Sequence, residues 1–549
     1  MFMRIVIAIG AICLPALPVL AQTPKPTVII TAKPISRLLS EYREMIRQVG
    51  GPSAGDNLVM AFDDKLKEQL GENGFEGVDI NRPIAAYTVV KERFEDTNPI
   101  LLVPINGEKE IIGFLKSMKM EASAVKDKKG LYMLRVRGLD FLPNDSFMQI
   151  VDGWAYIGLN GDDVGDAKNR LPIENLFSDA DQSLFTVKLF PGQFPEKLLK
   201  EWLATMDMAV IGIGAFAGMG GPPEVQKMVQ TFFDQGPKLL RRYAETGIKE
   251  VEEVRVQFSW EANTGDTLTE LTLIPKAGSM LAKDIAARAA TTHRFSGLTH
   301  AHAAIAVSAN LPLFAKELRE IIATVPGAME AGLKSTNLPE QFQPLVEEVV
   351  KALTESIKKG DMDISFALVG PDKNGKFTLA MAVSMADTAA IEKTLRQTAK
   401  AGEFEKEFEF DVVKAAGISI HKVPIARAVH EELHLDMSKL FGEKPLAYVA
   451  FAKDAAFVTF GPDSLAVMKT AVASKTGPAP VLEVSANANS FHKLIAAVGT
   501  EKEATEFARL FGTEDKQVSL LRVYVEGGQT LKAKATLNLR YIPRLSLLD

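Results

Sequence analysis

The chain reads IAVSANLPLFAKELREII over residues 305–322 and LEVSANANSFHKLIAAV over residues 482–498. Both stretches contain Val-Ser-Ala-Asn, and a phenylalanine, Phe314 or Phe491, follows four residues after each asparagine. Each begins with β-prone residues and continues with apolar residues at helical spacing, which predicts a strand followed by an amphipathic helix. The same strand-and-helix pattern occurs at residues 28–31 with 37–47 and at residues 184–187 with 195–205.

Alternating apolar segments, arranged in pairs, follow three of these strand-and-helix patterns. Asn, Asp or Gly residues separate the members of each pair, which is a direct signal for a β-hairpin. A further amphipathic helix, opening at Pro223 or at Pro339, precedes two of the hairpins. We name the strand and helix, with the hairpin where one follows, pattern X. The hairpins are predicted at residues 254–260 with 268–274, 364–369 with 377–383, and 520–525 with 531–539.

A different pattern, named Y, lies between the first and second X patterns and again between the third and fourth. It consists of a hairpin, a strand and a helix. Asp163 and Ser464 are predicted as the N-caps of its two helices, because their side chains can accept backbone N–H bonds. Its parts lie at Asp152-Gly153, residues 154–159 and residues 164–170, and then at Asp454-Ala455, residues 456–460 and residues 465–473.

The order of the patterns along the chain is X-Y-X followed by X-Y-X. We therefore predict an internal duplication, with a first domain at residues 22–297 and a second, similar domain at residues 298–549. Hairpins dominate both halves, so each domain is expected to hold a mainly antiparallel sheet with helices packed on one face. The predicted fold class is α+β.

Composition and charge exclude several classes of protein. The chain has 549 residues, of which 47% are hydrophobic and 24% are charged, as in ordinary globular proteins. Its net charge is −6, so no basic face is expected that would attract nucleic acid. Cys13 is the only cysteine, which excludes thiolate metal sites and cysteine nucleophiles from a chain that begins after it.

Residues 1–21 have the pattern of a secretory signal peptide. Arg4 supplies a positive charge, an apolar run follows, and Val19 and Ala21 place small residues at the −3 and −1 positions. The apolar run is short and contains prolines near its end, which disfavours a membrane-spanning helix. We predict cleavage before Gln22 and export to the periplasm or the exterior. Retention of the segment as an uncleaved anchor is the alternative.

The residues His430-Glu431-Glu432-Leu433-His434 form the pattern H-E-x-x-H. On a helix this spacing places both imidazoles on one face, where they can hold zinc while the first glutamate activates a water molecule. The second glutamate stands where such enzymes carry an uncharged residue, and no third histidine follows. A third ligand would have to be distant, such as Glu443 or Glu483. A solvated helical turn is the other interpretation, so no metal and no other cofactor is assigned.

Three further segments carry weaker signals. Gly51-Pro52-Ser53-Ala54-Gly55 matches G-x-S-x-G, but a predicted helix precedes it, which favours a helix–helix loop over a nucleophile elbow. His300 and His302 alternate on a predicted strand, an arrangement more typical of surface or half-buried histidines than of metal ligands. Residues 208–221 are apolar and glycine-rich, and form either a buried loop or an apolar flap that contacts lipid, a ligand or a partner.

The strand, turn, strand and helix signature KDAAFVTFGPD at residues 453–463 resembles large exported bacterial proteins of unknown function. This resemblance implies export and a duplicated α+β domain, and it carries over no catalytic residue. We expect a non-catalytic envelope or extracellular protein that binds a partner protein or an apolar ligand through its sheet surfaces or residues 208–221. The alternative is a zinc-dependent metallopeptidase that uses His430, Glu431 and His434.

Overall fold

The computed structural model divides the chain into two units. Unit 1 contains Met1–Trp202, Thr246–Ala282 and Asn538–Pro543. Unit 2 contains Leu203–Glu245, Lys283–Leu537 and Arg544–Asp549. The structure describes residues 25–71, 74–136, 145–177, 183–201, 204, 223–298, 303–312, 316–335, 340–400, 405–424, 437–499, 502, 505 and 519–538.

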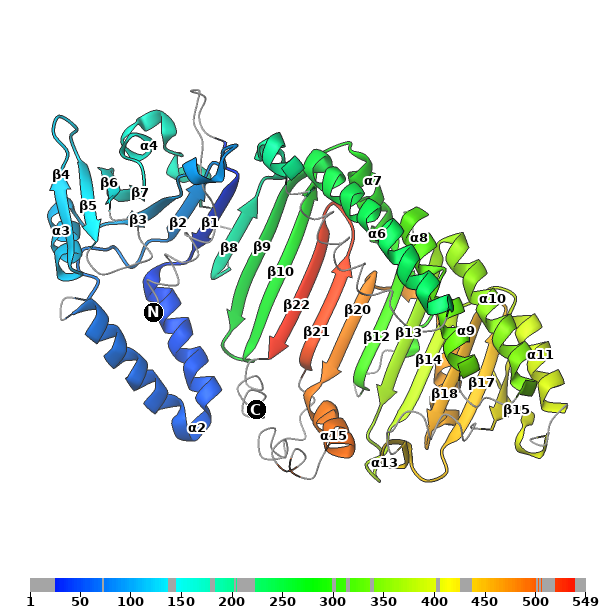
Figure 1. The fold of residues 1–549 in the computed structure, drawn as a ribbon. Helices are drawn as coiled ribbons and strands as arrows, with labels where there is room; N and C mark the ends of the chain where they lie inside the picture. The colour runs from blue at the N-terminus through cyan, green and yellow to red at the C-terminus, as the bar shows by residue number, and fades with distance from the viewer. Residues whose placement is uncertain are drawn as a thin grey trace. The chain divides into compact units, whose positions relative to one another are not determined.

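Unit 1 contains an antiparallel sheet (Figure 1). Its strands are β1 (Val28–Ala32), β2 (Ile84–Thr88), β3 (Ile100–Pro104), β4 (Met120–Ala124), β5 (Leu131–Val136), β6 (Asp145–Val151), β7 (Trp154–Gly158), β8 (Phe185–Leu189), β9 (Val251–Glu261) and β10 (Asp266–Pro275). Side by side, they follow the order β4-β5-β6-β7-β3-β2-β1-β8-β9-β10. The first and last X patterns of the unit therefore meet through β1 and β8.

Unit 2 also contains an antiparallel sheet. Its strands are β12 (Ala303–Pro312), β13 (Asp361–Val369), β14 (Thr378–Ser384), β15 (Glu409–Ala415), β16 (Ile418–Val423), β17 (Leu446–Ala452), β18 (Ala455–Gly461), β20 (Leu482–Asn487), β21 (Ser519–Glu526) and β22 (Leu531–Asn538). They follow the order β15-β16-β17-β18-β14-β13-β12-β20-β21-β22. A separate pair joins β11 (Thr292–His293) to β19 (Gly477–Pro478).

The strand order of unit 2 repeats that of unit 1, position by position. Strand β12 stands where unit 1 has β1, and β20 stands where unit 1 has β8. Each unit therefore follows the predicted order X-Y-X. The shared order agrees with an internal duplication, which itself stays a prediction.

The helices of unit 1 connect the strands of its sheet. Helix α2 (Ile35–Leu70) turns back on itself at Gly51, whose φ of 66° lies in the left-handed region that glycine adopts readily. Figure 1 shows the two arms of α2 in blue. Further helices are α3 (Glu108–Ser117) and α4 (Gly161–Gly165), with 3₁₀ turns η1 (Phe94–Asp96), η2 (Ala167–Asn169), η3 (Ile173–Asn175) and η4 (Pro191–Gln193). Residues 196–201 are helical as well.

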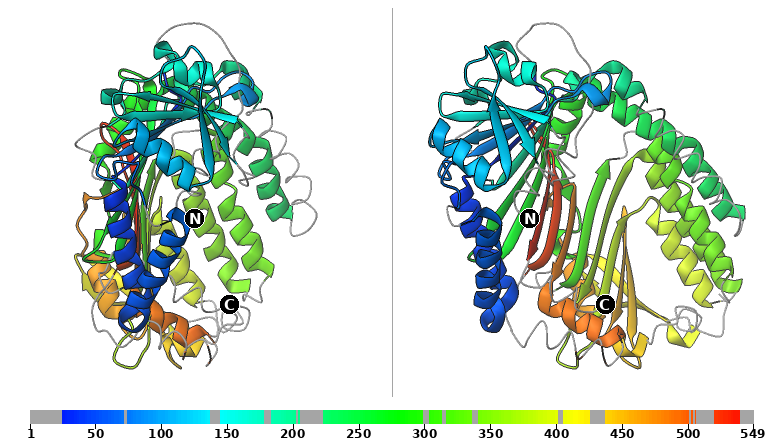
Figure 2. Two further views of the ribbon diagram at one scale, coloured as in Figure 1. Left: turned by 90° about the vertical axis from the view of Figure 1, so that its left-hand side faces the viewer. Right: turned by 60° about the vertical axis from the view of Figure 1, so that its left-hand side comes forward.

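Most helices of unit 2 also lie between its strands. They are α8 (Lys316–Ile322), α9 (Val325–Ser335), α10 (Gln343–Lys359), α11 (Thr388–Lys400), α13 (Met437–Phe441), α14 (Ser464–Val472) and α15 (Ala488–Val498). Figure 2 shows α10 and α11 in yellow-green, side by side along the strands of this unit. Helices α6 (Pro223–Glu250) and α7 (Met280–Ala287) span the sequence positions at which the units change. The 3₁₀ turns are η5 (Arg288–Ala290), η6 (Ser296–Leu298), η7 (Glu340–Phe342) and η8 (Glu405–Glu407).

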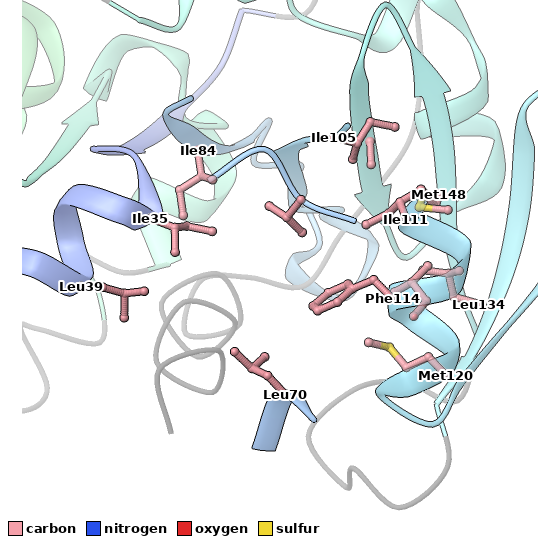
Figure 3. Packing of buried hydrophobic residues seen from close by; sticks show 13 residues of the cluster. Ile35, Leu39, Leu70, Ile84, Ile105, Ile111, Phe114, Met120, Leu134 and Met148 are labelled. Carbon is pink, nitrogen blue, oxygen red and sulfur yellow. The ribbon is translucent and has the colours of Figure 1, made fainter. Parts of the chain in front are cut away.

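The core of unit 1 lies on both faces of its sheet. On one face, Ile84 and Ala155 pack with residues of α2 and α3 (Figure 3). On the other face, Ala85 and Tyr156 pack with Val164 of α4. Neighbouring residues of a strand point to opposite faces, so Ile84 and Ala85 mark the two cores.

Unit 2 is built in the same way. Ala380 and Ala382 pack with Met468 of α14 on one face. Val383 and Ala456 pack with α10 and α11 on the other face. The prediction that the helices pack on one face of each sheet therefore needs correction. The central strands are apolar on both sides, and each side requires a helix to exclude water.

Two predicted helix caps are also corrected. Asn160, and not Asp163, is the N-cap of α4, and its side chain accepts a hydrogen bond from the Asp162 N–H at 2.8 Å. Asp163 lies inside the helix and accepts a hydrogen bond from the Asn98 side chain. Ser464 is the first residue of α14 and follows the cap position. In both cases the helix begins earlier than the apolar periodicity alone indicates.

The predicted α+β class with antiparallel sheets is confirmed. Near the centre of the chain, unit 1 changes to unit 2 between Ala282 and Lys283. The predicted boundary between residues 297 and 298 stays a prediction. Within the part of the chain that the structure describes, no helix combines the length and the apolar character needed to cross a bilayer.

Candidate functional site

A line of apolar side chains crosses one face of the sheet in unit 2. Met381 of β14 pairs with Phe366 of β13 and with Val458 of β18. Because directly paired residues of antiparallel strands point to the same face, the pairing can be followed from strand to strand. We name this line open row 2, and its members are Val458, Met381, Phe366, Val307, Val484, Val523 and Ala535.

Helices cover the sheet on both sides of open row 2 where it crosses β14 and β18. On one side, Val383 and Ala456 pack against α10 and α11. On the other side, Leu379 and Phe460 belong to a core with residues of α13 and α15. The ring centroids of Phe441 and Phe460 lie 4.7 Å apart in this core. Open row 2 therefore runs between two covered margins.

Open row 2 itself keeps apolar surface in contact with solvent. Met381 is 46% exposed and Val458 is 42% exposed, and the other members are half-buried. Phe366 among them also packs against the core of α13 and α15. No member carries a hydrogen-bonding side-chain group. Exposed apolar surface is unfavourable in water by ~25 cal/mol per Å². A contiguous surface of this kind is typical of a binding site.

The opposite face of β20, β21 and β22 is polar. Glu483 of β20 forms an ion pair of 2.9 Å with Arg522 of β21. The Arg522 and Lys534 cations lie over the ring of Tyr524, at 5.3 and 5.6 Å from its centroid. A sheet with one solvated face turns its polar side to water. Water can therefore solvate the polar face of these strands. The apolar face gains no such stabilisation from water, so we look for an apolar group that could cover it.

The dimensions of open row 2 follow from strand geometry. Strands lie ~4.8 Å apart, so the spacings from β18 to β22 add up to ~29 Å. Residues two apart along a strand are ~7 Å apart, which sets the width of the line. One leaflet of a bilayer contributes ~15 Å of hydrocarbon. A fully extended lipid acyl chain therefore fits along open row 2.

Most segments that the sequence singled out lie outside the described residues. This holds for His430, Glu431 and His434, for His300 and His302, and for residues 208–221. Glu483, a distant candidate for a third zinc ligand, is paired with Arg522. Among the described residues, no group of three or more His, Cys, Asp or Glu side chains has the arrangement of a metal site. The zinc site therefore stays an untested prediction.

The segment from Gly51 to Gly55 lies within α2. A helical arm precedes the turn at Gly51, and a second arm follows it. A Cβ on Gly50 would lie 2.7 Å from the Cα atom of Gly55, so these glycines allow the arms to approach each other. A nucleophile elbow requires a strand before the serine. The geometry here is that of a helical hairpin.

A buried contact between a histidine and a carboxyl group lies at the sheet of unit 2. Nδ1 of His293 is 2.6 Å from a carboxylate oxygen of Asp363, and the two side chains are 1% and 0% exposed. The other carboxylate oxygen accepts a hydrogen bond from the Arg294 N–H at 2.8 Å. Asp363 donates its own N–H to the Ser384 hydroxyl oxygen at 2.9 Å. This pair anchors β11 to β13, and its burial gives a substrate no access.

A second charged cluster joins α11 to β15 and β16. Nε2 of His421 lies 3.3 Å from a carboxylate oxygen of Glu392, and Nδ1 accepts a hydrogen bond from the Asp411 N–H. The guanidinium of Arg396 donates hydrogen bonds to the carboxylates of Glu392 and Asp411. Burial lowers the pKa of His421, and the nearby Arg396 cation adds to the lowering. The cluster fixes the helix to the sheet edge.

The sequence pattern did not identify open row 2. Within each strand, apolar residues occupy every second position, as at Val307 and Ala309 or at Val523 and Val525. This alternation shows that one face of the strand is apolar, but not which strands lie beside it. The line appears only when the cross-strand register is known, because its members come from strands far apart in the chain.

No family model, curated protein or solved structure matches this chain.

Proposed function

We propose that this chain is an exported binding protein that holds the hydrocarbon chain of a lipid on open row 2. The observation that carries the proposal is the exposure of Met381 and Val458 between two margins of the sheet that helices cover. Singly exposed apolar side chains are common on folded proteins, but these two are directly paired and belong to a continuous apolar line, as at binding sites. The predicted signal peptide at residues 1–21 supports a site of action outside the cytoplasm.

The chemistry of the row supports a hydrocarbon occupant over a polypeptide. Every member of open row 2 is apolar, and so are its immediate neighbours Val383, Leu379 and Leu368 on the same face. An extended peptide on this surface would leave backbone N–H and C=O groups without partners, at ~1–3 kcal/mol each. A hydrocarbon chain has no such groups. Ordinary protein interfaces are also only ~56–58% apolar.

The size of the row sets the affinity that we expect. A strip of ~29 by ~7 Å covers ~200 Å². Removing that area from water on both surfaces, ~400 Å² in all, contributes ~10 kcal/mol. The loss of freedom on association offsets at least ~4 kcal/mol of this. The remaining ~6 kcal/mol corresponds to a dissociation constant of tens of micromolar.

The test is a fluorescence titration with the uncharged probe N-phenyl-1-naphthylamine. Met381→Lys places a charged group in the open row and should weaken binding at least tenfold, because the ammonium would lose water when the probe covers it. Met280→Lys is the matched control, since Met280 is 64% exposed but lies outside the row. This control should bind like the wild type.

Circular dichroism should show that both variants keep their strands and helices. Equal binding of the probe by the wild type and by a folded Met381→Lys variant would refute the assignment of open row 2. Absence of binding by the wild-type protein at hundreds of micromolar probe would refute the proposed function itself.

A further inference from the structure

A second line of apolar side chains crosses the sheet of unit 1. Ile30 of β1 pairs with Ala86 of β2 and with Val187 of β8. The pairing continues through β3 to β7 on one side and through β9 to β10 on the other. We name this line open row 1, and its members are Ile157, Leu101, Ala86, Ile30, Val187, Val256 and Leu271.

Open row 1 occupies the same strand positions as open row 2. Each row runs from the strand before the short helix of pattern Y to the last strand of the unit. Leu271 at one end of open row 1 is 39% exposed, and the other members are half-buried. Ile157 at the opposite end packs against the core with residues of α2 and α3. No member has a polar side chain. The two lines therefore share their place in the sheet and their chemistry.

The margins of open row 1 are covered as well. On one side, Phe185 and Phe258 pack in a core with residues of α2. On the other side, Val28 is 5% exposed and Thr88 is 4% exposed. The surface left open is narrow, and it follows the line of paired residues across the strands.

The opposite face of β8, β9 and β10 is polar. It carries Lys188, Arg255 and Gln257, which pair across strands with residues that also point away from open row 1. Arg255 forms an ion pair with Glu253 at 2.7 Å. Thr186 and Thr272 on this side are 2% and 6% exposed, so solvent reaches it only in part. The apolar side, like the face of unit 2 that carries open row 2, would be stabilised by an apolar ligand that excludes water from it.

We infer that unit 1 holds a second site for a lipid acyl chain on open row 1, so that one protein molecule binds two chains. This inference rests on the proposed function of open row 2. The occupant is identified by what the surface lacks. The members of open row 1 carry no charge and no hydrogen-bonding side-chain group, so the line matches an uncharged hydrocarbon and not a polar headgroup or a peptide backbone.

The test counts ligands by native mass spectrometry of the full-length mature protein with 1-monomyristoylglycerol, a neutral lipid with one acyl chain. The wild type should bind two molecules. Leu271→Lys and Met381→Lys should each bind one, and the double variant should bind none. Met280→Lys, the exposed control outside both rows, should bind two. Leu271→Gln, which adds polarity without charge, should weaken the second binding event at least threefold if the lysine variant fails to fold.

The outcomes separate the two ideas. A wild type that binds one lipid, lost in Met381→Lys and kept in a folded Leu271→Lys variant, would overturn the second site and leave the proposed function intact. A wild type that binds no lipid would overturn the proposed function. Two bound lipids that persist in both folded lysine variants would overturn both assignments.

Discussion

At the scale of single residues, apolar side chains that are neighbours in one strand differ in burial, because they point to opposite faces of the sheet. Ala382 is buried against α14, whereas its neighbour Met381 is 46% exposed on the other face of the same strand. His293 and Asp363 are polar residues placed in the core, where their side chains meet at 2.6 Å. A buried contact of this kind contributes mainly by specifying how β11 docks, since removing one partner would leave a buried polar atom of the other without its neighbour.

His421 predicts a pH response of folding. Its pKa is lowered in the folded chain by burial and by Arg396, whereas in the unfolded chain it is near ~6.5. Between these values the unfolded state binds more protons, so the stability is full above pH ~6.5 and is lost as the pH falls through the folded-state pKa. His421→Gln should flatten the dependence of the unfolding free energy on pH between 7.5 and 5.5, by at most ~1.4 kcal/mol per pH unit.

Urea unfolding at several pH values measures this response. His492→Gln should flatten the curve in the same direction, because burial also lowers the pKa of His492. Parallel curves for the wild type and His421→Gln would show that His421 titrates equally in the folded and unfolded chains.

At the scale of elements, close approach and turn geometry decide where helices bend. The turn in α2 needs the left-handed φ of Gly51 and the bare backbone of Gly50 and Gly55. Helix α3 has no such demand. Its Gly113 is exposed, and a Cβ placed there would meet no atom within 4 Å.

This contrast predicts opposite effects of one substitution. Gly55→Ala would bring a Cβ against the carbonyl oxygen of Arg47, and the overpacking should destabilise the chain by ~1–3 kcal/mol. Gly113→Ala should stabilise it by ~0.5–1 kcal/mol, because alanine loses less backbone freedom in a helix. Urea unfolding of both variants gives the comparison. A Gly55→Ala variant as stable as Gly113→Ala would mean that the arms of α2 can separate without loss.

At the scale of the whole molecule, one strand order is used twice. In both units the first strand, β1 or β12, lies inside the sheet, and the strands up to the end of pattern Y are added on one side of it. A later strand, β8 or β20, then pairs with the other side of the first strand. Both also carry an apolar line at equivalent strand positions. These agreements support the proposed duplication, and a surface present in both units is more readily explained by a shared use than by packing alone.

Export is the prediction that belongs to the whole chain. Expression in a bacterial host should give a periplasmic or secreted protein whose intact mass corresponds to a start at Gln22. Such a protein should not react with thiol reagents, because Cys13 is the only cysteine. Arg4→Glu reverses the charge that signal peptides require at their start, and it should leave precursor in the cell. A full-length chain found attached to the membrane would favour the uncleaved anchor.

The sequence by itself determined the types and order of the main elements. Hairpin turns, helical spacing and the repeated Val-Ser-Ala-Asn segments predicted β20 at residues 482–487 as it is observed, and predicted most other strands to within a few residues. These signals are local, because a hairpin or an amphipathic helix is encoded by residues close together in the chain. The N-caps at Asn160 and Asp463 were missed because several neighbouring residues can cap equally well.

Only the tertiary structure decided which faces are covered and which stay open. Alternation along a strand defines two faces, but it does not say which one a helix will occupy, so α14 on the face opposite α10 could not be foreseen. The open rows depend on the register between strands such as β12 and β20, far apart in sequence. A shift of one residue in that register would send the same side chains to the other face. Burial is set by such long-range pairing, and for this reason the candidate site is a property of the fold and not of any single segment.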